Sequence, residues 1–117
     1  KDLPKFYYVN WFRKDDEGDY MWPGYGDNAR VLKWIFERSE GMAQGVQTLI
    51  GIMPNLDDFD TSGLNIQRET LQQLFEVDKA AWLKEMAELK DYYQKLGDKM
   101  PQALYDELEK QIQRLNA

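Results

Sequence analysis

The side chains best suited to chemistry in this sequence are aromatic, and most of them lie near its start. Ten of the sixteen Phe, Tyr and Trp residues fall between residues 6 and 36. Tyr20, Trp22 and Tyr25 lie in a stretch that Pro23 and two glycines interrupt, where regular burial is difficult. Rings on such a loop can hold a flat ligand by stacking, which contributes about 1–3 kcal/mol per base in single-strand binders. The alternative is that these rings only cover a small core.

Residues 24–29 (G-Y-G-D-N-A) have the spacing G-x-G-x-x-A directly before an expected helix. A dinucleotide-binding fingerprint of this type needs a preceding buried strand and an acidic residue about 20 positions later. Trp22-Pro23 precedes the first glycine, and residues 46–54 supply no such acid. We therefore expect no Rossmann phosphate loop. The glycines still allow the backbone to approach a ligand closely, and the helix start offers free N–H donors.

Two acidic stretches are more typical of solvated loops than of metal sites. In residues 15–19 (D-D-E-G-D) the glycine is fourth, whereas an EF-hand needs glycine sixth and glutamate twelfth. Asp57, Asp58 and Asp60 form the second stretch. The sequence contains no histidine and no cysteine, which excludes His-dependent triads, His or thiolate metal ligands and disulfides within it. We nominate no catalytic residue and no metal ligand here.

Length, charge and hydropathy narrow the class of protein. The 117 residues, 43% hydrophobic and 31% charged, fit one domain better than two separate cores. The net charge is −6 and no basic cluster stands out, so we expect no nucleic-acid partner. No apolar run approaches 18 residues, so we expect no membrane partner. A strand-like run begins soon after Lys1, and a strand needs neighbouring strands, of which this chain offers few. We therefore expect the chain to be the end of a longer polypeptide.

The elements that position the aromatic residues can be predicted from periodicity. Residues 5–12 are rich in aromatics and valine and predict a strand, followed by a polar turn over residues 13–19. A helix should follow with Asp27 or Asn28 as its N-cap, and Gly41 should end it. Residues 46–54 predict a second short strand, and residues 55–63 an acidic loop. The apolar positions of the helix are Val31, Leu32, Ile35 and Phe36, with Trp34 beside them.

From about residue 67 onward the pattern is helical throughout. A short helix is followed by a longer one that Gly97 ends, and Pro101 suits the first turn of a third. Their apolar positions are Leu71, Leu74 and Phe75, then Trp82, Met86, Leu89, Tyr93 and Leu96, then Leu104, Leu108, Ile112 and Leu115. The prediction is thus a mostly helical α+β fragment. Residues 1–65 form a lobe with short strands and an aromatic loop, and residues 66–117 form a helical tail.

Two blocks make this sequence resemble the C-terminal part of GTP-dependent phosphoenolpyruvate carboxykinases. Residues 9–14 match the family pattern V-N-W-F-R-K, and residues 22–32 match W-P-G-F-G-E-N-S-R-V-L. Residues 49–54 are similar to P-I-G-Y-x-P, while residues 77–79 and 97–101 resemble the tail of bacterial members. The resemblance covers essentially the whole chain, and W-P-G-[FY]-G-[DE]-N is its most specific part.

The resemblance implies a cytoplasmic, monomeric enzyme of gluconeogenesis. It would convert oxaloacetate and GTP to phosphoenolpyruvate, GDP and CO2 with Mn²⁺ and Mg²⁺. This segment would belong to the larger α/β nucleotide-binding domain and contribute the guanine-base pocket. The positions that match the family's pocket are Phe12, Tyr20, Tyr25, Gly26, Asp27 and Asn28. The family usually has phenylalanine at the positions of Tyr20 and Tyr25, so each hydroxyl needs water or a protein partner.

The same resemblance implies that the remaining catalytic machinery lies upstream of Lys1. That machinery comprises the family's phosphate loop, metal ligands, substrate arginines and mobile lid. The upstream part of the polypeptide is therefore an expected partner, and the segment alone is expected to be inactive.

Two other classes of function stay open from the residues alone. An aromatic platform that includes Trp22 and Tyr25 could stack on carbohydrate. The chain could instead be a helical interaction domain that binds no ligand.

Overall fold

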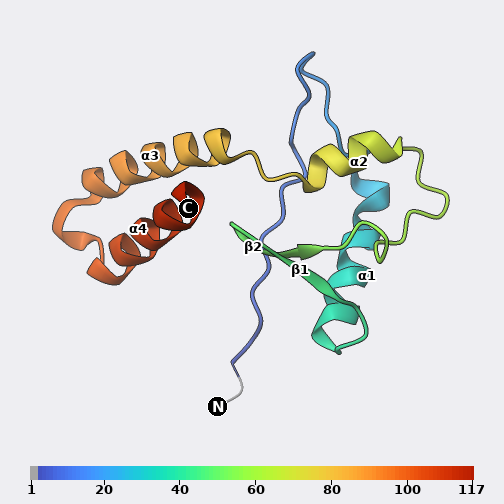
Figure 1. The fold of residues 1–117 in the computed structure, drawn as a ribbon, viewed down its shortest axis with the longest axis horizontal. Helices are drawn as coiled ribbons and strands as arrows, with labels where there is room; N and C mark the ends of the chain where they lie inside the picture. The colour runs from blue at the N-terminus through green and yellow to red at the C-terminus, as the bar shows by residue number, and fades with distance from the viewer. Residues whose placement is uncertain (1–2) are drawn as a thin grey trace. The chain divides into compact units, whose positions relative to one another are not determined.

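The computed structural model describes residues 3–117 and is about half helical, with one two-stranded hairpin in that range (Figure 1). This agrees with the predicted α+β fragment, although the helical share is about half rather than most of the chain. The elements in order are the 3-10 turn η1 (Tyr25–Asp27), α1 (Asn28–Ser39), β1 (Gly45–Thr48), β2 (Gly51–Pro54), α2 (Arg68–Phe75), α3 (Lys79–Leu96), the 3-10 turn η2 (Gly97–Lys99) and α4 (Gln102–Asn116).

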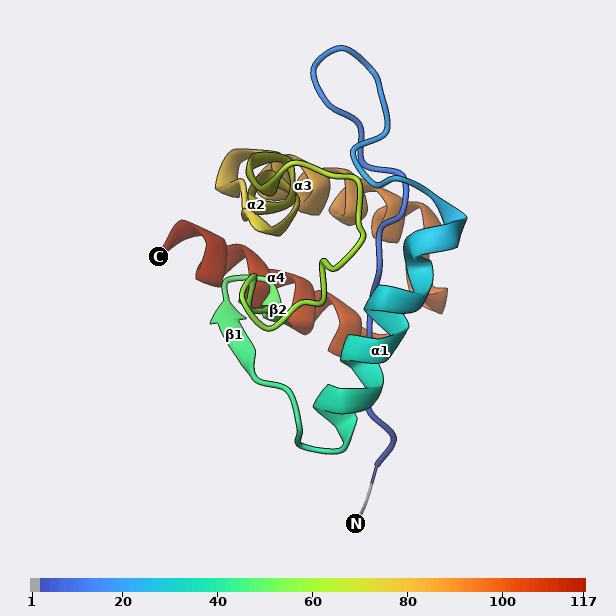
Figure 2. The same ribbon diagram turned by 90° about the vertical axis from the view of Figure 1, so that its right-hand side faces the viewer.

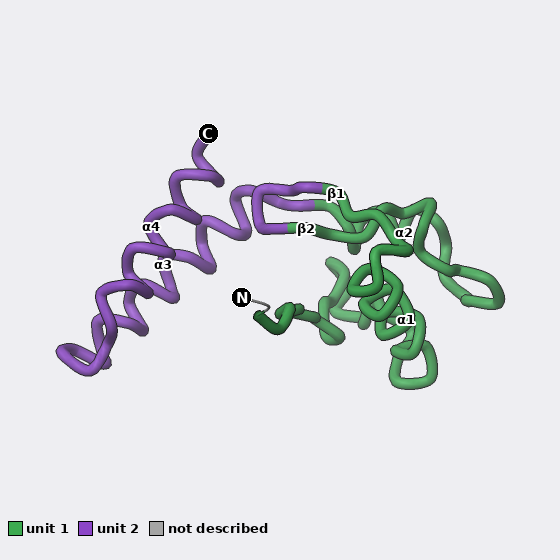
Figure 3. The backbone as a smooth tube through the Cα atoms, turned by 90° about the horizontal axis from the view of Figure 1, so that it is seen from below, with its two compact units in different colours: residues 1–46, 52–76 green, residues 47–51, 77–117 purple. Residues whose placement is uncertain are grey.

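The chain divides into two compact units (Figure 3). Unit 1 contains the residues up to Val46 together with Ile52–Glu76, and unit 2 contains Gln47–Gly51 and Val77–Ala117. The tip of the β1–β2 hairpin is thus grouped with α3 and α4. The predicted division of roles between residues 1–65 and 66–117 stays a prediction.

The core of unit 1 is aromatic. Its buried residues are Trp22, Trp34, Ala43, Phe59 and Leu71, with partly buried Trp11, Val31, Ile35, Leu56, Leu74 and Phe75 packed against them. Trp22 contacts Phe59 with ring centroids 6.3 Å apart, and Phe59 contacts Phe75 at 5.5 Å. Part of the aromatic-rich N-terminal stretch therefore serves the core, as one of the two interpretations of the sequence holds.

The predicted strand over residues 5–12 is wrong, because this segment forms no regular element. Figures 1 and 2 show it running alongside α1. Lys5 Nζ donates to the Ser39 carbonyl at 2.9 Å, the Tyr7 hydroxyl lies 3.1 Å from Ser39 Oγ, and the Tyr7 ring packs edge-on against Trp34. A strand needs the backbone of a neighbouring strand. Here side chains attach the segment to a helix instead.

Residues 13–19 form a tight polar turn, as predicted. Lys14 and Tyr20 make an isolated antiparallel bridge, and Asp15 Oδ1 accepts from the backbone N–H groups of Glu17 and Asp19 at 3.0 and 2.9 Å. One oxygen of the Asp15 carboxylate thus stabilises the turn by accepting two of its backbone N–H groups. Across residues 3–117, no cluster of three or more acidic, His or Cys side chains could hold a metal ion.

Helix α1 forms close to its predicted bounds, but its predicted apolar face is only partly right. Trp34 is the buried residue of the helix, whereas Leu32 and Phe36 are exposed. Val31, Trp34 and Ile35 share one face at spacings of three and four residues, and Leu32 and Phe36 flank it. The apolar side chains of α1 thus cover more of the helix surface than the core can bury. The face that carries the Trp34 indole is the buried one. Beyond α1, Gly41 has the positive φ of 77° that suits glycine after a helix.

The single strand predicted over residues 46–54 is a hairpin of two strands. Leu49 and Ile50 form the turn, Gly51 follows with a φ of 131°, and Thr48 Oγ1 donates to the Gly51 carbonyl at 2.7 Å. A continuous apolar run does not distinguish one strand from two strands joined by a two-residue turn. The glycine is the residue that marks the turn.

Unit 2 contains the last two predicted helices, α3 and α4, which lie side by side (Figures 1 and 3). Tyr93 and Tyr105 pack edge-on at 5.6 Å, and Lys90 and Glu109 form an ion pair at 2.7 Å. Asp78 caps α3 by accepting from two backbone N–H groups. On α4, Leu108 and Leu115 are buried as predicted.

Three details of the helical tail differ from the prediction. Leu96 and Leu104 are exposed rather than packed. Pro101 occupies the N-cap position of α4 rather than its first turn.

No helix within residues 3–117 combines the length and apolar character needed to cross a membrane.

Asp60 links the acidic loop of residues 55–63 to α1. Lys33 Nζ lies 2.8 Å from Asp60 Oδ2, and the hydroxyl and backbone N–H of Ser62 donate to Oδ1 at 2.6 and 3.0 Å. The Lys33 hydrogen bond, then those from Ser62, hold the pKa of the Asp60 carboxyl well below its ordinary value of 3.8. The same pairing raises the pKa of Lys33.

This lowered pKa predicts a pH-dependent contribution of Asp60 to stability. Ionised Asp60 stabilises unit 1 at pH values above about 3.8, and the contribution is lost as the pH falls toward the folded-state pKa. We expect Asp60→Asn to melt at a lower temperature than wild type at pH 7, with the difference narrowing below pH 4. Asp58→Asn is the control, because Asp58 lies in the same loop and has no ion pair among residues 3–117. Identical pH profiles for the two variants would contradict this assignment.

Candidate functional site

The six residues predicted for a ligand site all lie in unit 1. Phe12 and Tyr20 flank the polar turn of residues 13–19, while Tyr25, Gly26 and Asp27 form η1 and Asn28 begins α1. Gly24, with a φ of 126°, turns the chain from Trp22-Pro23 into η1, and the Asp27 N–H donates to its carbonyl at 3.1 Å. The predicted residues therefore occupy two neighbouring stretches of chain on either side of Trp22.

Three of these residues present exposed aromatic rings. Phe12 is 71% exposed, Tyr20 60% and Tyr25 92%. Phe12 and Tyr20 pack edge-on with centroids 6.1 Å apart, and Lys14 Nζ lies 5.1 Å from the centroid of the Tyr20 ring. Within the described residues Tyr25 pairs with no other ring. The structure therefore brings Phe12 and Tyr20 together, while Tyr25 extends from η1 as a separate apolar surface.

The burial of Trp22 weighs against a carbohydrate platform. Trp22 is 7% exposed and contacts Trp11 and Phe59 at centroid distances of 6.2 and 6.3 Å. A ring enclosed in this way cannot offer a face to a sugar together with Tyr25. The exposed and buried aromatic residues thus have separate roles, and sequence spacing alone does not separate them.

The polar side chains at the start of α1 are engaged with the protein rather than with the helix cap. Asp27 occupies the N-cap position but makes no side-chain cap hydrogen bond. Its Oδ1 instead accepts from Arg30 Nε at 3.0 Å. Asn28 Oδ1 accepts from Trp22 Nε1 at 2.8 Å. Asp27 is therefore the N-cap by position only, and Asn28 is the first residue of the helix.

Arg30 is a residue that the sequence reasoning missed. Besides its ion pair with Asp27, Arg30 donates from Nη1 to the Asp60 carbonyl at 3.1 Å. It thereby connects η1 to the loop of residues 55–63. The i,i+3 spacing of an acidic and a basic residue at a helix start was the available signal. No signal in the sequence indicated the long-range contact of Arg30 with Asp60.

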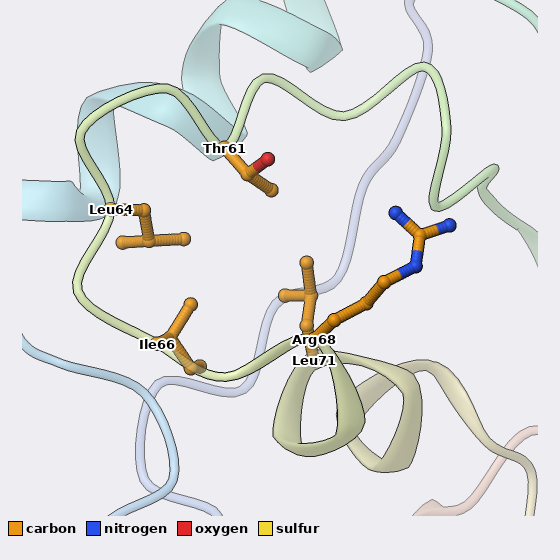
Figure 4. Close-up of a pocket in the computed structure, with 5 residues that line it drawn as sticks. All are labelled: Thr61, Leu64, Ile66, Arg68 and Leu71. Atoms are coloured by element: carbon orange, nitrogen blue, oxygen red, sulfur yellow. The ribbon is translucent and has the colours of Figure 1, made fainter.

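A shallow pocket elsewhere in unit 1 contains none of the six residues. Figure 4 shows Thr61, Leu64 and Ile66 contributed by the loop before α2, and Arg68 and Leu71 by α2 itself. The Arg68 side chain extends away from Leu64 and Ile66, and its guanidinium pairs with Asp57 at 2.7 Å. We assign no ligand to this pocket.

Comparison with known proteins agrees with the resemblance described above. Residues 1–114 match the family model described as the phosphoenolpyruvate carboxykinase C-terminal P-loop domain, and the chain belongs to this family.

Curated relatives with the name phosphoenolpyruvate carboxykinase [GTP] match almost the whole chain. The protein of Treponema pallidum (strain Nichols) is 47% identical over 117 residues, which cover 99% of this chain and 19% of the relative. Those of Chlamydia pneumoniae and Arthrobacter sp. (strain FB24) are 44% and 42% identical over 107 and 113 residues, covering 91% and 97% of this chain and 18% of each relative. The chain thus spans about a fifth of the length of these relatives.

Proposed function

We propose that this chain supplies the guanine-base site of a GTP-dependent phosphoenolpyruvate carboxykinase. The observation that carries the proposal is the exposure of three rings, Phe12, Tyr20 and Tyr25, on the stretches of chain that lead into the helix that Asn28 begins. Family membership and the GTP in the relatives' names favour a guanine nucleotide as the ligand. The longer polypeptide would convert oxaloacetate and GTP to phosphoenolpyruvate, GDP and CO2, in gluconeogenesis and in the cytoplasm.

The rings and the amide have different tasks in this proposal. Aromatic faces stack on any purine, so Phe12, Tyr20 and Tyr25 supply affinity with little base preference. Guanine carries an acceptor at O6 and donors at N1 and N2, whereas adenine carries an amino donor at N6. Asn28 reads this edge. Gly26 and Asp27 line the nucleotide with their backbone, and Gly26 has no side chain that would obstruct the approach. Open space surrounds the position where a Cβ would stand on Gly26.

The residues of this segment do not fit Mn²⁺ or Mg²⁺. Residues 3–117 hold no cluster of acidic, His or Cys side chains that could bind a metal ion. In this proposal the metals, the triphosphate and oxaloacetate are bound by the rest of the polypeptide, and the isolated segment has no carboxykinase activity.

Removing the Phe12 ring tests the stacking part of the proposal. In the full-length carboxykinase that carries this segment, we expect Phe12→Ala to lower kcat/KM for GTP and for ATP by a similar factor. Loss of about 1–3 kcal/mol of stacking corresponds to roughly five- to a hundredfold. Phe12→Tyr keeps the ring and should stay near wild type. Wild-type kinetics in Phe12→Ala would place the base elsewhere.

A further inference from the structure

The indole of Trp22 determines which atom of Asn28 can meet a ligand. Trp22 Nε1 lies 2.8 Å from Asn28 Oδ1. An indole N–H can donate a hydrogen bond but cannot accept one, so the side-chain atom of Asn28 that faces it must be the carbonyl oxygen. The amide nitrogen Nδ2 is then the group left for another partner. Among residues 3–117 it makes no hydrogen bond, although the Asn28 side chain is half-buried.

The donor that holds this amide is itself fixed by packing. Trp22 is buried in the core of unit 1, where its ring contacts the rings of Trp11 and Phe59. Rotation of the indole would disturb these contacts. The backbone between Trp22 and Asn28 is also constrained, because η1 follows Gly24 directly and its Asp27 is paired with Arg30. The orientation of the Asn28 amide is therefore set by the folded core before any ligand arrives.

We propose, on the basis of the proposed guanine site, that Trp22 is a positioning residue. It sets the preference for guanine over adenine through Asn28. With Oδ1 engaged, Asn28 offers an NH2 donor to the base. The carbonyl at C6 of guanine accepts that donor, whereas the amino group at C6 of adenine places a second donor against it. A free asparagine could rotate its amide and accept from adenine instead. The Trp22 hydrogen bond removes that option, because rotation would leave the indole N–H facing another donor.

The test removes the indole N–H while the aromatic body remains. In the full-length carboxykinase we expect Trp22→Phe to lower the ratio of kcat/KM for GTP to that for ATP about fivefold or more, since a mismatched buried donor costs roughly five- to a hundredfold. A purely structural role would lower both values together and leave the ratio unchanged. Replacing Trp22 by 3-benzothienylalanine, which has sulfur in place of the N–H, gives the same test with the ring size preserved if Trp22→Phe folds poorly.

Trp34→Phe is the matched control. Trp34 is buried in the same core, but its Nε1 has no hydrogen-bond partner among the described residues, so the substitution changes packing without releasing an amide. We expect its GTP-to-ATP ratio to stay at the wild-type value. An unchanged ratio in both Trp22 variants, or an equal fall in Trp34→Phe, would overturn the inference.

One further variant separates this inference from the proposed function. Asn28→Asp keeps an oxygen that can accept from the Trp22 indole but has no NH2 group. We expect it to lose preference for GTP as well. If Asn28→Asp loses the preference and the Trp22 variants keep it, only the positioning role of Trp22 is wrong. If neither changes the preference, the guanine site itself is wrong.

Discussion

Asn28→Ala is expected to lower kcat/KM for GTP about five- to a hundredfold more than kcat/KM for ATP. The factor corresponds to the roughly 1–3 kcal/mol lost when a matched partner is removed from a buried polar group. Stacking on Phe12, Tyr20 and Tyr25 is unaffected by this change and serves both purines. The preference for one purine should therefore fall while part of the affinity for both is retained. Steady-state kinetics with the two nucleotides in the full-length carboxykinase provide the measurement.

A helix-cap role for Asn28 predicts a different outcome. A lost cap would lower the melting temperature and leave the GTP-to-ATP ratio unchanged. In the structure Asn28 follows the N-cap position, and its Oδ1 accepts from Trp22 rather than from the first backbone N–H groups of α1. Asn55→Ala is the matched control, because the Asn55 side chain accepts only a local backbone hydrogen bond in the acidic loop. An unchanged ratio in Asn28→Ala would contradict base reading by this residue.

Leu71→Ala is expected to lower the free energy of unfolding of unit 1 by about 2–5 kcal/mol. Leu71 is 2% exposed and lies in the cluster of Trp22, Trp34 and Phe59, so truncation leaves a cavity among large rings that cannot easily collapse into it. Denaturant unfolding followed by tryptophan fluorescence reports mainly on this unit, because Trp11, Trp22 and Trp34 lie in it, whereas Trp82 lies in unit 2.

Leu32→Ala is the control for this stability prediction. Leu32 lies on α1 and is 59% exposed, so its truncation should change the free energy of unfolding by no more than about 0.5 kcal/mol. Both variants make the same chemical change on a helix. Equal effects would mean that the core of unit 1 is not centred where the structure has it.

Local signals in the sequence predict the helices well. Gly97 and the recurring Trp82, Met86, Leu89 and Tyr93 are sufficient for α3, and the caps and spacings act within a few residues of each other. The strand predicted at residues 5–12 fails for the opposite reason. Aromatic and β-branched residues favour a strand only where another strand is available for pairing. Here the Lys5 and Tyr7 side chains form hydrogen bonds with Ser39 of α1 instead.

The residues of the candidate site stay a prediction from the family resemblance, and the contacts among them could not be predicted from the sequence. The W-P-G-Y-G-D-N block carries the family resemblance and contains Tyr25 through Asn28. That Trp22 is core while Tyr25 is exposed depends on packing against Phe59, which is 37 positions later in the chain. The hydrogen bond from Trp22 to Asn28 likewise depends on the turn at Gly24, and no periodic pattern encodes it.

Photo-crosslinking with 8-azidoguanosine triphosphate tests most directly whether this segment holds the guanine base. The azide sits on the base itself, so the labelled peptide reports where the base lies in the full-length carboxykinase. We predict that the label is found between residues 12 and 28, on the segment that carries Phe12, Tyr20 and Tyr25, and that GTP competes for it better than ATP. Labelling confined to other parts of the polypeptide, or to residues 61–71 around the shallow pocket, would contradict the proposed site.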